Sequence, residues 1–183
     1  MDELSLEHTR RFTRAEFDAM CDAGYFADER MELLRGYLVP RMSEGDEHHW
    51  LSTVLLNTLI RSIEQTYLVT QNGPFAATDD SVPLPDIYVF NRGRKEPGRR
   101  PSEALLLVEV AHTSYRRDKN LKLPMYAENG VPEYWIVNIN TRSTEVFTDP
   151  VDGEYTTCVV VPFAEPLRPR FAPHVELVLD QLS

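Results

Sequence analysis

The chain has 183 residues, of which 42% are hydrophobic and 26% charged, and its formal net charge is -10. This length fits one domain that buries about two-thirds of its unfolded surface, so we expect a single domain over residues 1–183, with residues 1–12 as a flexible arm. No apolar run approaches the roughly 18 residues of a membrane span, which excludes a membrane protein. The acidic start of the chain lacks the features of a signal peptide, and two cysteines are too few for a disulfide framework. We therefore expect a cytoplasmic protein whose Cys21 and Cys158 lie in the core.

The acidic balance counts against nucleic acid as a partner, because binding to phosphates usually needs a basic face. The positive charges are unevenly spread, however, and nine of the 19 basic residues fall between Asn91 and Lys122. They are Arg92, Arg94, Lys95, Arg99, Arg100, Arg116, Arg117, Lys119 and Lys122. This pattern fits a local basic patch, and it fits equally a solvated loop followed by an exposed helix face.

Helical spacing of apolar residues and capping signals predict three helices, over residues 14–23, 46–65 and 114–129. A capping box at Thr13 and Glu16 starts the first helix. Ser43 and Asp46 are candidate caps for the second helix. Pro124 lies inside the third helix and should kink or split it.

Runs of β-branched and aromatic residues predict strands between and after these helices. The predicted strands cover residues 31–39, 67–70, 75–78, 86–90, 104–111, 133–138, 143–147 and 154–161. Residues 91–102 are rich in Arg, Gly and Pro and indicate an exposed loop. Residues 175–182 close the chain as a short strand or helix.

Glu109 lies inside the apolar run from Leu105 to Val110, which is typical of a buried strand. An ionised carboxylate there costs several kcal/mol unless a cation pairs with it. Asp86 begins a neighbouring apolar strand just after a proline, so the two carboxylates can converge. They would repel each other unless a hard cation such as Mg²⁺ or Mn²⁺ held both. We therefore predict a metal site at Asp86 and Glu109, with Lys122 nearby.

Asp118, Lys122 and Tyr126 are spaced four residues apart and form one polar stripe on the third predicted helix. If the stripe faces the two carboxylates, it brings an ammonium group to the metal site, where it can position water and stabilise charge on a phosphate. The same spacing also fits an exposed Asp–Lys pair worth only about 0.3 to 0.5 kcal/mol. Spacing alone leaves both interpretations open.

Several blocks of the sequence resemble the Uma-two family of restriction endonucleases, a branch of the PD-(D/E)XK nuclease superfamily. The resemblance runs from about Arg30 to the C-terminus, and its longest block is Gly130 to Val137. The other matching residues are Arg30–Gly36, Glu47-His48, Pro85-Asp86, Leu107–Val110, Ser114, Arg116–Asp118, Lys122-Leu123 and Tyr126-Ala127. The resemblance implies an α/β (α+β) fold with a restriction-endonuclease-like mixed β-sheet core flanked by helices.

The resemblance also implies roles for individual residues. Asp86, Glu109 and Glu32 would be the acidic metal ligands and, with Lys122, the catalytic residues. Lys122 takes the place of the usual lysine two residues after Glu109, because Ala111 stands there. Further residues are expected to line the site, namely His48, Ser114, Asp118 and Tyr126. Those expected to bind nucleic acid are Arg116, Arg117 and Lys119.

The leading hypothesis is an endonuclease that uses Mg²⁺ or Mn²⁺ to hydrolyse phosphodiester bonds in DNA. A homodimer is expected because a DNA duplex presents two strands. The alternative is a catalytically inactive module that keeps the nuclease fold for binding or regulation, as the acidic net charge suggests. On that view an internal hydrogen-bond network holds Glu109, and Asp118 and Lys122 form a surface pair.

Overall fold

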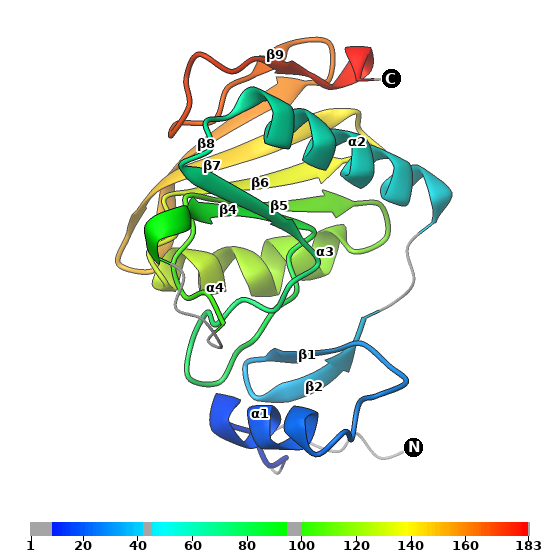
Figure 1. The fold of residues 1–183 in the computed structure, drawn as a ribbon, viewed down its shortest axis with the longest axis vertical. Coiled ribbons are helices and arrows are strands. Elements are labelled where there is room, and N and C mark those ends of the chain that lie inside the picture. The colour runs from blue at the N-terminus through cyan, green and yellow to red at the C-terminus, as the bar shows by residue number, and fades with distance from the viewer. Residues whose placement is uncertain (1–8, 42–44, 95–99, 183) are drawn as a thin grey trace.

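A six-stranded mixed sheet forms the centre of the protein (Figure 1). The structure is a computed structural model and describes residues 9–41, 45–94 and 100–182. Neighbouring strands are antiparallel except for β5 and β6, which are parallel. The strands, in spatial order, are β3 (Tyr67–Gln71), β4 (Ile87–Asn91), β5 (Leu106–Ala111), β6 (Glu133–Asn138), β7 (Ser143–Val151) and β8 (Glu154–Pro162). The predicted mixed sheet flanked by helices is confirmed.

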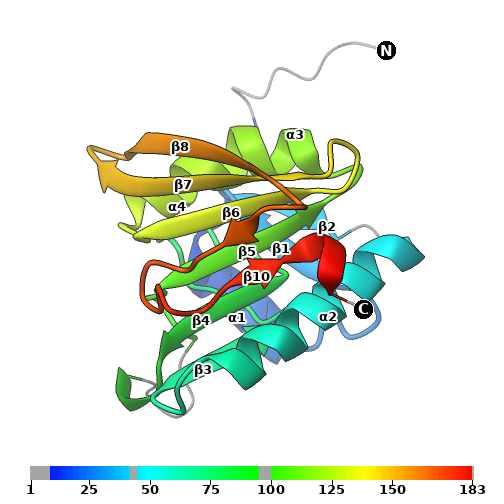
Figure 2. The same ribbon diagram turned by 90° about the horizontal axis from the view of Figure 1, so that it is seen from above.

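Helices cover both faces of the sheet (Figures 1 and 2). One face packs against α2 (Asp46–Ser62) and the C-terminal β9 (Pro166–Leu167), β10 (Leu177–Val178) and η4 (Leu179–Gln181). The other face packs against a helical run of three parts, α3 (Tyr115–Arg117), η3 (Asp118–Lys122) and α4 (Leu123–Glu128). Alternate residues of β5 enter the two cores, which places Glu109 on the second face.

The third predicted helix is one helical run with a wide turn inside it. Its central part, η3, is a π-helix of five residues, and Pro124 follows in the first turn of α4. Proline has no backbone N–H to donate to the preceding turn, and its ring clashes with a carbonyl of that turn. These two effects account for the π-helical turn beside Pro124. Ser114 occupies the N-cap position of α3 without a capping hydrogen bond, and Gly130 ends the run with φ of 72°.

The predicted strand over residues 31–39 is wrong in one respect, because it is a hairpin. β1 (Met31–Leu34) and β2 (Tyr37–Pro40) pair antiparallel through a turn at Arg35 and Gly36, which have φ of 53° and 81°. Together with α1 (Arg14–Asp22), which begins at the predicted capping box, they form an N-terminal unit with its own small core. A bridge between Leu33 and Val82 connects this unit to the rest of the chain.

Other differences from the predictions concern single segments. Residues 75–78 form no strand, only a bridge from Thr78 to Ser81. Cys21 is partly buried and packs against the core of the N-terminal unit, whereas Cys158 is exposed on β8, so the predicted core position is wrong for Cys158. The N-cap of α2 is Gly45, while Ser43 lies outside the described residues, as do residues 1–8 of the predicted arm. In the described ranges, no helix has the length and apolar character needed to cross a bilayer.

Candidate active site

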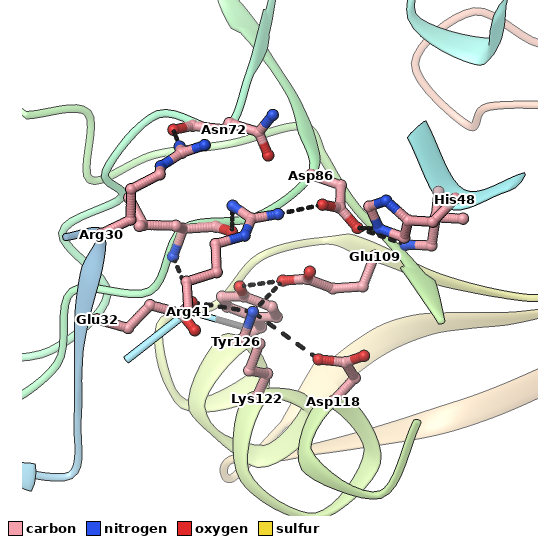
Figure 3. A network of polar contacts seen from close by, with 12 residues as sticks. Arg30, Glu32, Arg41, His48, Asn72, Asp86, Glu109, Asp118, Lys122 and Tyr126 are labelled. Carbon is pink, nitrogen blue, oxygen red and sulfur yellow. Dashed lines mark hydrogen bonds and ion pairs between the residues drawn. The ribbon is translucent and has the colours of Figure 1, made fainter. Parts of the chain in front are cut away.

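Glu109 lies at the centre of the polar cluster in Figure 3. It is 3% exposed, and its side chain leaves β5 on the face that η3 and α4 cover. Its Oε1 accepts a hydrogen bond from Lys122 Nζ at 2.8 Å and another from the Tyr126 hydroxyl at 3.0 Å. The irregular turn at Pro124 therefore leaves Tyr126 in line with Lys122. The structure pairs the buried carboxylate with a cation of the protein itself.

Glu32 reaches the same lysine from β1, on the N-terminal unit. Its Oε1 lies 3.0 Å from Lys122 Nζ and accepts a hydrogen bond of 2.7 Å from Leu84 N. Glu32 is fully buried, and its Oε2 has no hydrogen-bond partner among the described residues. A buried carboxylate oxygen without a partner is costly, so a further cation or a water molecule at this position would stabilise Glu32.

Asp118 lies on η3, four residues before Lys122, and is 1% exposed. Its Oδ1 is 3.8 Å from Lys122 Nζ, which makes an ion pair but is too long for a hydrogen bond. Burial raises the pKa of Asp118 and outweighs the opposite effects of Lys122, Ser114 and Arg117. The stripe from Asp118 to Tyr126 therefore faces the interior, and its interpretation as an exposed surface pair is wrong.

Asp86 lies directly before β4, and its two oxygens have different partners (Figure 3). Oδ1 forms an ion pair with the guanidinium of Arg41. Oδ2 lies 3.0 Å from His48 Nε2 on α2 and accepts a hydrogen bond of 2.7 Å from Val110 N on β5. Arg41 also donates to the Leu84 carbonyl oxygen at 2.9 Å. Burial raises the pKa of Asp86, but the contacts with His48, Arg41 and Val110 outweigh it and hold that pKa below its ordinary value.

Arg41 is the site residue that sequence reasoning missed. It follows β2 by one residue and belongs to no recognised motif. Its place beside Asp86 depends on the turn at Arg35 and Gly36, which reverses the chain so that β2 runs back along β1. The sequence indicated only that a buried Asp86 needs a cation, and the prediction took that cation to be a metal ion instead of an arginine.

The charges of this cluster keep the lysine protonated. Burial lowers the pKa of Lys122, but Glu109, Glu32 and Asp118 together have the larger effect, so this pKa lies above its ordinary value. Burial also raises the pKa of Glu109, to about 8, and the neighbouring acids add to the rise while Lys122 opposes it. Lys122 can therefore donate hydrogen bonds and stabilise anions, but it cannot accept a proton at neutral pH.

The three basic residues predicted to bind nucleic acid have different surroundings. Arg116 is exposed on α3. Lys119 Nζ lies 2.6 Å from Glu145 Oε2, which ties this side chain to β7. Arg117 is half-buried, and its charge favours the ionised form of Glu32. In the structure Arg116 is therefore the one of these three whose side chain is fully presented to solvent.

The acids suit a hard divalent cation, but the protein's own cations already pair with them. Carboxylate oxygens are the ligands that Mg²⁺ and Mn²⁺ prefer, and the unpartnered Oε2 of Glu32 fits such a donor set. Within the described residues, no three His, Cys, Asp or Glu side chains are already grouped as metal ligands. Arg41 holds Asp86 Oδ1, and Lys122 holds Glu109 Oε1. An ion at this site would therefore share these carboxylates with Arg41 and Lys122.

The mixed sheet with helices on both faces, and the acidic cluster around a buried lysine, agree with the restriction-endonuclease-like fold expected from the sequence. The chain belongs to the Uma2 family, described as "Putative restriction endonuclease", whose profile matches residues 14–180. This confirms the resemblance seen in the sequence. The fold is similar to a crystal structure described as a putative nuclease belonging to DUF820 from Anabaena variabilis, with a TM-score of 0.68 and 14% identity over 85% of this chain and 90% of that one. No curated protein matches the sequence.

Proposed function

We propose that this protein is a metal-dependent endonuclease that hydrolyses phosphodiester bonds in DNA. The observation that carries the proposal is Lys122, buried and protonated between Glu109 and Glu32. Well-packed apolar residues often stabilise a fold as well as a buried ion cluster does, so such a cluster suggests a functional role. Membership of a family of restriction endonucleases supports the class of reaction.

Asp86 and Glu109 are the residues we propose to hold Mg²⁺ or Mn²⁺, with Glu32 as the third carboxylate. When bound, the ion supplies a Lewis acid that activates water and offsets the charge of a phosphate. The hydrogen bond from Tyr126 and the contact with His48 fix the directions of Glu109 and Asp86.

Lys122 contributes a fixed positive charge beside these carboxylates. As a protonated donor it orients water and stabilises the negative charge that develops on the phosphate. Arg41 also belongs to this proposal, because an ion held by Asp86 Oδ1 would lie beside the guanidinium that pairs with that oxygen. Its planar guanidinium suits a phosphate oxygen of the substrate.

DNA in the cytoplasm is the substrate we propose. Arg116, Arg117 and Lys119 lie on α3 and η3, the elements that also carry Asp118 and Lys122. Contacts from Arg116 to phosphates, with Arg117 and Lys119 adding positive charge nearby, would position the duplex without reading its sequence. The net charge of -10 limits this attraction to a local patch.

Thermal unfolding with and without Mn²⁺ tests the metal site. We expect Mn²⁺ to stabilise the wild type, by about 2.7 kcal/mol at a hundred times the dissociation constant. Asp86→Asn should lose this shift, whereas Asp22→Asn, which changes an exposed carboxylate on α1, should keep it. The wild type and Asp22→Asn should nick plasmid DNA, whereas Asp86→Asn and Glu109→Gln should not. An equal shift in Asp86→Asn and the wild type would exclude this metal site.

A module that binds without catalysis is the second candidate. The pairing of Asp86 with Arg41 and His48, and of Glu109 with Lys122, favours it, because these carboxylates already have partners. Such a module would bind DNA equally well in EDTA and in Mg²⁺ and would never nick it. DNA binding that requires a divalent cation would exclude this candidate.

A further inference from the structure

The two edge strands of the central sheet differ in length and in how far their residues are exposed. Figure 2 shows β3 and β8 at its opposite sides. β3 has five residues, all partly buried, and α2 packs beside it. β8 has nine residues, of which seven are exposed, and within the described residues its one neighbouring strand is β7. α4 packs against one face of β8, but no further strand pairs with its outer edge within the described residues, so the longer and more exposed edge is on the β8 side.

The sequence of β8 lacks the usual protection of an edge strand. Natural proteins protect such strands with charged side chains, prolines or bulges, because unpaired backbone groups recruit another strand. Residues 155–161 contain no charged side chain, and Pro162 stands only at the last position of the strand. Val159 and Val160 are 52% and 58% exposed, so the edge is apolar as well as open.

We propose that β8 pairs antiparallel with β8 of a second copy of this chain, which joins two sheets into one across a two-fold axis. Beyond Glu154 at its start, the strand offers no charge that would select a different acidic or basic partner, and its own copy matches it in length and character. Pairing over the full length sets Glu154 opposite Pro162. Cys158, the middle residue of the nine, then lies opposite itself at the axis.

Charge complementarity at the ends of the strand supports the same partner. Arg142 adjoins the Pro162 end, because its carbonyl oxygen accepts a hydrogen bond of 3.0 Å from Phe163 N. Its side chain is 61% exposed and pairs with Asp180, and an ion pair this exposed holds the guanidinium only weakly. Two-fold pairing brings Glu154 of one copy towards Arg142 of the other, at both ends of the interface. Because β6 and β7 separate β8 from β5, the pairing leaves the acidic cluster of each copy uncovered.

Sedimentation equilibrium of the full chain tests the proposal, with an expected mass of twice 21.1 kDa. Val159→Lys and Val160→Lys each place like charges near the axis, and each should raise the dissociation constant of the dimer about tenfold or more. Ile60→Lys is the matched control, since Ile60 is also 52% exposed but lies on α2. A wild type that stays monomeric at every concentration overturns the proposal and leaves the metal site unaffected.

Oxidative cross-linking tests the register. Directly opposed residues of an antiparallel pair have Cα atoms about 4.5 to 5.5 Å apart, within the range of a disulfide. In a Cys21→Ser background, mild oxidation should produce a dimer linked through Cys158, and the additional change Cys158→Ser should abolish it. A dimer that forms no such link and that neither lysine variant weakens would use another surface, which also overturns the proposal.

Discussion

At the scale of single residues, the site is a balance of buried charges around one lysine. Lys122 Nζ lies 2.8 Å from Glu109, 3.0 Å from Glu32 and 3.8 Å from Asp118. The ionised acids depend on that cation, because removal of the lysine leaves their charge in a medium that solvates it poorly. The cluster is therefore more sensitive to the loss of one member than to the loss of a matched pair.

Lys122→Met should lower the free energy of unfolding by about 3 to 5 kcal/mol, because the buried acids lose their shared cation. The double variant Lys122→Met with Glu109→Leu should recover part of this loss, since it removes a pair instead of one partner. Urea unfolding of the two single variants and the double variant measures the coupling. If the loss of unfolding free energy in the double variant equals the sum of the losses in the two single variants, Lys122 and Glu109 are not energetically coupled.

At the scale of elements, the site depends on how the N-terminal hairpin turns. Gly36 has φ of 81°, and a Cβ at this position would lie 2.6 Å from Arg11 Cβ. The turn therefore needs glycine both for its backbone conformation and for space. Because β1 carries Glu32 and the chain after β2 carries Arg41, this turn positions two of the groups that surround Lys122 and Asp86.

Gly36→Ala should cost about 1 to 2 kcal/mol from the left-handed conformation alone, and more from the clash with Arg11. We also expect a smaller stabilisation by Mn²⁺, since Glu32 would be displaced. Gly93→Ala is the control, because its Cβ would have no neighbour within 4 Å and its φ is not positive. Circular dichroism melts of both variants, with and without the ion, give the comparison, and equal behaviour of the two would contradict the role assigned to this turn.

The sequence predicted the contacts around Glu109 better than the contacts around Asp86. Glu109 stands out because a charge interrupts an apolar strand, and burial with a cation is what that position requires. Lys122 and Tyr126 stay on the same side of the helical run despite its π-helical turn, so both contact Glu109. Arg41 could not be predicted, because the apolar pattern of residues 31–39 fits one strand as well as two strands and does not reveal the turn.

At the scale of the whole molecule, the net charge of -10 opposes the polyanion that we propose as substrate. Attraction must then come from a few exposed cations close to the site, such as Arg116 on α3. A small number of phosphate contacts makes binding weak at physiological salt and gives it a shallow dependence on salt.

Arg116→Ala should lower the slope of log affinity against log salt by about 0.9 for duplex DNA, the value of one phosphate contact. Arg168→Ala is the matched control, because Arg168 pairs with Glu176 on the C-terminal segment, away from α3. Fluorescence anisotropy with a labelled duplex at several salt concentrations measures both slopes. An unchanged slope for Arg116→Ala would remove this residue from the DNA-binding surface.

The N-terminal unit makes the stability of the site differ from the stability of the central sheet. Glu32 lies on β1, outside the six-stranded sheet, and the core of its unit consists of Phe17, Leu33 and Val82 with a few partly buried neighbours. Units with small cores open locally at a lower free energy than the sheet beside them. Each opening withdraws a carboxylate from Lys122 while the sheet stays folded. Amide hydrogen exchange in β1, rather than the melting temperature of the chain, therefore reports the free energy at which the complete site opens.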